Sequence, residues 1–165
     1  MENQLPTNAE CLRISDQLRR AFHGEAWHGP SVGEALAGIT TEQAAAHPAG
    51  QVHSIWELVL HIRTWTHAAA ESTRGALMPP SVNDLPPEQD WPPVKEKTRT
   101  AWSSALQQMF RAAEDLGNAL ETFGDARLHE KVPGRSYNFY FLFHGVVQHS
   151  LYHAGQIALL KKMVG

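Results

Sequence analysis

Four long segments of the chain repeat apolar residues with the period of an α-helix. They run over residues 8–23, 55–74, 94–122 and 136–163. Apolar residues three and four positions apart share one face of a helix, and that face must be buried against another element. Four such faces predict an all-α fold in which the helices cover one another.

A proline-rich connector separates the second and third segments. It reads PPSVNDLPPEQDWPP at residues 79–93, and its six prolines favour an extended, semi-rigid chain. At ~3.1 Å per residue the connector spans about 46 Å, whereas a twenty-residue helix is about 30 Å long. It can therefore cross from one end of a bundle to the other. We predict a four-helix bundle with a long crossover between helices 2 and 3, in up-down-down-up order.

Helix-start signals mark further positions. Thr7 with Glu10 has the spacing of a capping box before the first long segment. SVGE at 31–34 and TTEQ at 40–43 have the same pattern and predict short helices between the first and second long segments.

Length and composition fit one soluble domain over residues 1–165, with 42% hydrophobic and 19% charged residues. The net charge is −3 without a dense basic block, so we do not expect nucleic acid as a partner. No run is long and apolar enough for a membrane span, so we expect no membrane partner. The first eighteen residues lack the pattern of a signal peptide, and we therefore expect a cytoplasmic location.

The single cysteine, Cys11, cannot form a disulfide within the chain. It shares helical spacing with Ile14, Leu18 and Phe22. This pattern favours a small buried core residue over a nucleophile.

Three of the ten histidines lie in apolar stripes. His149 and His153 are one helical turn apart in the last segment, so their Cβ atoms are about 5–6 Å apart. His61 lies in the stripe of segment 55–74. One metal ion held by these three imidazoles would keep a coordination position open for water or substrate. The alternative is that the pair at 149 and 153 consists of one buried and one partly exposed core histidine. His144 and His67 lie off the relevant faces and are not expected to join the site.

Two polar residues near this set have two interpretations each. Glu57 could act as a base, but it also occupies the capping-box position after Ser54, which we favour. Gln156 could orient a ligand or substrate from behind the histidines, or be an ordinary surface amide.

Aromatic residues could line a pocket beside the histidines. Trp56, Trp65 and Tyr152 have suitable spacings. Aromatic side chains at such spacings more often belong to the core.

Three stretches resemble the DinB-like (DinB/YfiT-like) proteins: HGVVQHSLYHAGQIALLKK at 144–162, HSIWELVLHIRTW at 53–65 and WHGPSVGEALAGIT at 27–40. The resemblance covers nearly the whole chain and implies a metal-binding four-helix bundle with the same crossover. It implies that a divalent ion binds through three histidines, which match His61, His149 and His153. It also implies a homodimer. Characterised relatives include transferases that join low-molecular-weight thiols to electrophiles, and related isomerases.

These observations predict a divalent-metal-dependent enzyme that acts on a small-molecule substrate, either a thiol-dependent transferase or a hydrolase. The buried cysteine favours a low-molecular-weight thiol as co-substrate over a thiol of the chain. Zinc or nickel is expected first and iron after them, because imidazole suits all three. The alternatives are a non-catalytic stress-response bundle that binds a metal or ligand, and a metal-free bundle whose histidines are core polar groups.

Overall fold

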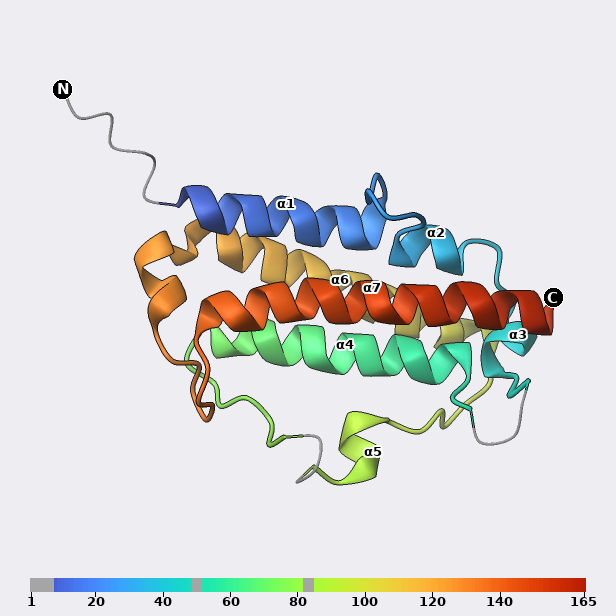
Figure 1. Cartoon of the computed structure of the whole chain (residues 1–165). Coiled ribbons are helices and arrows are strands. Elements are labelled where there is room, and N and C mark those ends of the chain that lie inside the picture. Colours follow the sequence, from blue (N-terminus) through green and yellow to red (C-terminus); the bar gives the residue numbers. More distant parts are fainter. Residues whose placement is uncertain (1–7, 49–51, 82–84) are drawn as a thin grey trace.

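The computed structural model describes residues 8–48, 52–81 and 85–165 and confirms the all-α prediction. Four long helices lie side by side (Figure 1): α1 (Ala9–His23), α4 (Ile55–Ser72), α6 (Arg99–Phe123) and α7 (Phe139–Val164). Across these three ranges the pairing of extended backbone is limited to an isolated bridge between Lys131 and Asn138.

Each long helix packs against two of the others. Helix α4 contacts α6 and α7, and α1 contacts the same two helices from the other side. Figure 1 shows that α4 and α6 run in one direction, and that α1 and α7 run in the opposite one. The described parts of the connector from α4 to α6, residues 73–81 and 85–98, lie along the outside of the bundle (Figure 1). It also contains a one-turn helix, α5 (Pro87–Asp90), which the extended-chain prediction did not include.

Two short helices follow α1, as their start signals predict. Helix α2 (Val32–Leu36) has a capping box made by Ser31 and Glu34. Helix α3 (Thr41–Ala45) has one made by Thr40 and Gln43. Helix α2 packs on α7 and α3 packs on α4, so both help to cover the bundle core.

The third and fourth long helices begin later than the apolar pattern predicts. Helix α6 begins at Arg99 because the Thr98 side chain accepts a hydrogen bond from the backbone N–H of Ala101. Helix α7 begins at Phe139 because the Asn138 side chain accepts one from the N–H of Phe141. Side-chain oxygens at these positions satisfy N–H groups that have no partner inside the helix.

Helix α1 is capped by a distant carboxylate. The predicted cap residue Thr7 lies outside the described residues. The N–H groups of Glu10 and Cys11 donate to the two carboxylate oxygens of Asp125, at 3.0 and 2.9 Å. Asp125 opens the 3₁₀ helix η1 (Asp125–His129) between α6 and α7, which the sequence pattern did not predict. The start of the first helix is therefore tied to the end of the third long helix.

Cys11 is a core residue, as predicted. Its side chain is fully buried, with Ile14 and Leu18 in the same cluster. Burial, together with the Asp125 carboxylate, raises the pKa of the Cys11 thiol to about 12. The thiol therefore stays protonated near neutral pH and is not a nucleophile.

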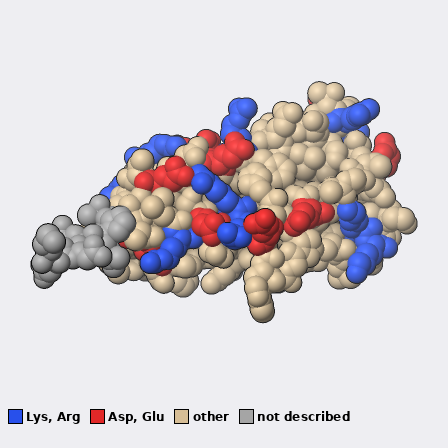
Figure 2. Space-filling model, turned by 90° about the horizontal axis from the view of Figure 1, so that it is seen from above, with Lys and Arg blue, Asp and Glu red and all other residues tan. Residues whose placement is uncertain are grey.

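The face that carries α1 presents both signs of charge (Figure 2). Ion pairs such as Arg20 with Asp16 and Arg13 with Glu10 place basic and acidic side chains next to each other there. In the described part of the chain, no helix has both the length and the apolar character that crossing a bilayer requires.

Candidate metal centre

Helix α4 places His61 on the inner side of the bundle. A capping box at Ser54 and Glu57 fixes its first turn. His61 lies between the buried residues Leu58 and Ile62, and its own exposed fraction is 4%. A polar ring at such a position needs hydrogen-bond or ligand partners.

Helix α7 places His149 and His153 opposite α4. The two residues are one turn apart, and their ring centroids are separated by 4.4 Å. His153 is buried and His149 is partly buried. The rings of His149 and His153 lie 4.9 and 4.8 Å from the ring of His61. The predicted convergence of the three imidazoles is thus present in the structure.

The three Nε2 atoms face one another. Nε2 of His149 lies 2.9 Å from Nε2 of His61 and 3.0 Å from Nε2 of His153. Two nitrogens on a tetrahedral zinc ion, each at 2.0–2.1 Å, would be about 3.3 Å apart. The three rings are therefore already close to the spacing of a ligand set. In the three described ranges this is the only group of histidine, cysteine or carboxylate side chains with such spacing.

Hydrogen bonds at the other ring nitrogens fix the tautomers of two histidines. Nδ1 of His61 donates to the backbone carbonyl of Asp90 at 2.8 Å. Nδ1 of His153 donates to Oε1 of Gln156 at 2.5 Å. Since the proton of each neutral ring is on Nδ1, each Nε2 presents a lone pair to the centre. The donor set therefore fits a divalent ion, which accepts lone pairs from neutral imidazoles.

Electrostatics keep the three rings neutral. Burial, and after it the neighbouring His153 and His61 rings, lower the pKa of His149 to about 3. Burial also lowers the pKa of His61, although the backbone and charge of Asp90 oppose it. Burial lowers the pKa of His153 against the opposing hydrogen bond with Gln156. Each ring therefore keeps a lone pair on one of its two nitrogens near neutral pH.

The crossover supplies two residues that sequence reasoning missed. The Asp90 carboxylate accepts a hydrogen bond from Nε1 of Trp65 at 2.7 Å and lies 3.2 Å from Nδ1 of His61. The Trp91 ring stacks on His61 with a centroid distance of 3.9 Å and on His53 with one of 3.6 Å. Neither residue belongs to a long amphipathic pattern, so spacing gave no signal for them. The connector therefore covers the site as well as crossing the bundle.

Glu57 has the capping role that we favoured. Its carboxylate accepts the Ser54 N–H at 2.7 Å and lies 3.0 Å from Nε2 of His47. Burial alone would raise the pKa of Glu57, but the hydrogen bonds from Ser54 and His47 outweigh it and lower the pKa. A carboxylate held in this way stabilises the start of α4.

His67 and His144, which we did not expect to join the site, lie outside the cluster of three histidines. His67 is exposed on α4. His144 contacts the Tyr140 ring at a centroid distance of 4.5 Å and belongs to another side of α7. Both results agree with the helical geometry used in the prediction.

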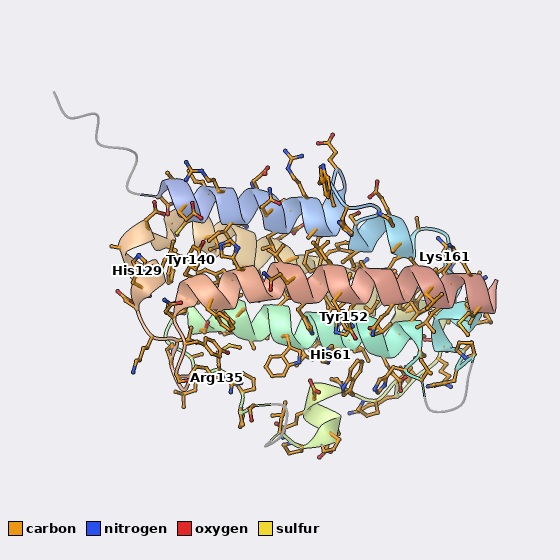
Figure 3. All side chains as sticks on the ribbon, viewed as in Figure 1. His61, His129, Arg135, Tyr140, Tyr152 and Lys161 are labelled. Carbon is orange, nitrogen blue, oxygen red and sulfur yellow. The ribbon has the colours of Figure 1, made fainter. Side chains whose placement is uncertain are left out.

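A cavity of about 580 Å³ opens beside the three histidines. Trp65 and Tyr152 line it, as the sequence allowed, and Figure 3 shows Tyr152 and His61 along the same stretch of α7 and α4. Trp56 belongs to the core instead, where it is 2% exposed and contacts Trp102. The lining is mostly apolar, which is typical of a site for a small molecule.

Comparison with known families agrees with this geometry. Residues 31–157 match the family model described as the DinB superfamily. The chain belongs to the DinB superfamily. The match includes all three histidines and the crossover, so it confirms the resemblance seen in the sequence. Comparisons of this DinB-superfamily chain with curated proteins and with solved structures gave no match.

Proposed function

We propose that His61, His149 and His153 bind one divalent metal ion through their Nε2 atoms. The support is the convergence of three neutral imidazoles, two of which have their tautomers fixed from behind. Zinc and nickel are the first candidates, followed by iron, because all three accept imidazole ligands.

We further propose that the protein is a metal-dependent enzyme that acts on a small molecule. The observation that carries this proposal is the position of the three histidines in the wall of the 580 Å³ cavity. A ligand in the cavity can reach a coordination position that the imidazoles do not fill. A bundle that only sequestered a metal would have no need for such access.

A thiol-dependent transferase is the form of this activity that the residues favour over a hydrolase. Cys11 is buried in the core and its thiol pKa is raised to about 12, so the nucleophilic thiol must come from a low-molecular-weight co-substrate. Asp90 is the one carboxylate among the described residues that line the cavity. Its Oδ1 contacts both Trp65 and His61, which makes it a poor general base for hydrolysis.

The chain's own groups would prepare the site for that chemistry. Asp90 and Gln156 hold the protons of His61 and His153 on Nδ1. Trp91 stacks on the His61 ring and restricts its rotation. When bound, a divalent ion would supply a Lewis acid that lowers the pKa of a thiol or water, or polarises a carbonyl.

The test of metal binding is elemental analysis of the chain purified without an affinity tag. We expect one ion per chain, lost in His61→Ala, His149→Ala and His153→Ala. His144→Ala and His67→Ala are matched controls and should keep the ion. A wild-type chain that binds no metal would contradict the first proposal.

The test of catalysis uses metal-loaded protein. It is incubated with low-molecular-weight thiols and electrophiles, and separately with ester and amide panels. We expect metal-dependent consumption of the thiol and no hydrolysis. Metal-dependent hydrolysis without thiol transfer would favour the hydrolase, and no turnover in any panel would favour the non-catalytic bundle.

Homodimerisation and a cytoplasmic location stay predictions. The first rests on the family resemblance. Light scattering of the purified chain measures the first directly.

A further inference from the structure

The cavity beside the histidines is elongated along α7. Its lining residues on this helix run from Phe141 to His153, which corresponds to about 18 Å at 1.5 Å per residue. His149 is about 12 Å along the helix from Phe141 by the same rise. The histidines therefore occupy one end of the cavity, and the start of α7 occupies the other.

A cation, Arg135, lies at that other end. It lines the cavity, and its guanidinium is 5.9 Å from the ring centroid of Tyr137. The Tyr137 ring in turn contacts Phe141, with a centroid distance of 5.2 Å. Figure 3 shows Arg135 toward the end of the bundle where α7 begins, on the side of the crossover.

Among the described residues, the guanidinium of Arg135 has no anionic partner. Its Nε is buried and makes no hydrogen bond within the part of the chain that the structure describes. No carboxylate of residues 8–48, 52–81 or 85–165 lies within ion-pair distance of it. A buried donor atom without a partner costs free energy. Because Arg135 as a whole is only partly buried, a ligand in the cavity can reach its guanidinium and satisfy this atom.

The loop that carries Arg135 is held in place by backbone hydrogen bonds. The N–H of Arg135 donates to the carbonyl of Val132 at 2.9 Å, and the N–H of Val132 donates to the carbonyl of Tyr137 at 3.0 Å. The carbonyl of Pro133 accepts from the N–H of Met78 at 3.0 Å. Gly134 turns the chain with φ of 80°, a conformation that favours glycine. The backbone that carries Arg135 is thus held at a fixed position relative to α7.

We propose that Arg135 binds a carboxylate group of the ligand whose reacting end lies at the three histidines. The ligand is then an elongated anion with an apolar body. Its carboxylate lies near the start of α7, which is about 12 Å along the helix from His149 by the rise per residue. Guanidinium groups bind carboxylates through paired, charge-assisted hydrogen bonds. This inference rests on the proposed function for the position of the reacting end, but the arginine site can be tested by itself.

The test uses three probes of one length: decanedioate, its monomethyl ester and its dimethyl ester. In the zinc-loaded chain, decanedioate can place one carboxylate at each end of the cavity. We expect it to bind about ten- to a hundredfold more tightly than the monoester, the range of one charge-assisted contact. The fluorescence of Trp65 and Trp91, which line the cavity, can report binding.

Two variants test the assignment to Arg135. The Arg135→Gln variant should bind decanedioate no more tightly than the monoester, with its zinc content unchanged. Arg111→Gln removes an equal charge from an exposed position on α6 and should behave as the wild type. If the dianion has no advantage in the zinc-loaded wild type, or keeps it in Arg135→Gln, the inference is wrong.

If the chain does not bind zinc, the proposed function is contradicted, but carboxylate binding by Arg135 can still be tested with the metal-free chain. In that case the metal-free chain should bind the monoester about tenfold or more tightly than the uncharged diester. Arg135→Gln should abolish this difference. Equal binding of the two esters by the metal-free wild type would then overturn the inference.

Discussion

Replacing Gln156 by alanine removes the acceptor that fixes the tautomer of His153. The hydrogen bond from Nδ1 of His153 to Oε1 of Gln156 is 2.5 Å long. Without it, the proton of the neutral ring can move to Nε2, where it would block the lone pair that faces the centre. We therefore predict that Gln156→Ala weakens metal binding while all three imidazoles stay in place.

The structure sets the size of this effect. His61 receives its tautomer from a backbone carbonyl, which the substitution leaves intact. Nδ1 of His149 has no hydrogen-bond partner among the described residues, so its tautomer is not fixed from behind by them. The substitution therefore frees the tautomer of His153 and leaves that of His61 fixed. Loss of such an outer partner typically costs 10–100-fold in affinity, and one neutral hydrogen bond contributes about 1 kcal/mol. We expect an effect near the lower end, about tenfold or ~1.4 kcal/mol.

The assay is competition with a chromophoric zinc chelator, using tag-free protein. Gln148→Ala removes the same side chain from an exposed position of α7 and should leave the dissociation constant unchanged. Gln156→Glu keeps an acceptor at the same distance and should bind zinc at least as tightly as the wild type. An unchanged dissociation constant in Gln156→Ala would refute the claim that this side chain prepares His153.

Three further outcomes follow from the fold and the site. Asp125→Ala should lower the free energy of unfolding by about 0.5–2 kcal/mol at pH 7, as measured by urea denaturation. Burial alone would raise the pKa of Asp125, but hydrogen bonds from the N–H groups at the start of α1 outweigh it and lower the pKa overall. Its contribution is therefore present above the unfolded-state pKa of ~3.9 and lost as the pH falls through the lower folded-state value, where the two proteins should converge. In Gly33→Ala the new Cβ would lie 2.8 Å from the carbonyl oxygen of Phe22, so we expect a loss of about 1–3 kcal/mol. Gly155→Ala meets nothing within 4 Å and should instead stabilise by about 0.5–1 kcal/mol; an equal loss in both would contradict the steric argument. Zinc at a hundred times its dissociation constant should raise the melting temperature by about 5–11 °C. Chelation or His61→Ala should abolish that rise, and its persistence in His61→Ala would place the ion elsewhere.

The long helices and the histidine cluster could be predicted because they depend on local spacing. Burial of an apolar stripe repeats every three or four residues, and His61, His149 and His153 each continue such a stripe. When helices pack with their apolar faces together, the residues on those faces must contact one another. Capping boxes predicted the short helices for the same reason, since Ser31 and Thr40 act on N–H groups three residues away.

The remaining features depend on contacts between distant parts of the chain. Asp90 and Trp91 reach the site only because the connector folds back onto α4. Asp125 caps a helix that begins more than a hundred residues earlier. Arg135 lines the cavity because its loop is hydrogen-bonded to Met78, the residue just before the connector. None of these pairings has a periodic pattern, so the sequence alone carried no signal for them.

The backbone carbonyl that orients His61 has a consequence for inheritance and for engineering. Because the carbonyl belongs to the main chain at position 90, the path of the connector specifies it and the identity of the side chain does not. Natural variants that exchange that side chain would lose the carboxylate contacts with Trp65 and His61 but could still present the same carbonyl oxygen to the imidazole. A design that transferred only the three histidines to another bundle would lack this carbonyl oxygen, and the tautomer of the residue equivalent to His61 would not be fixed. The smallest unit that could be transferred to another protein is accordingly α4 and α7 together with the connector that carries position 90.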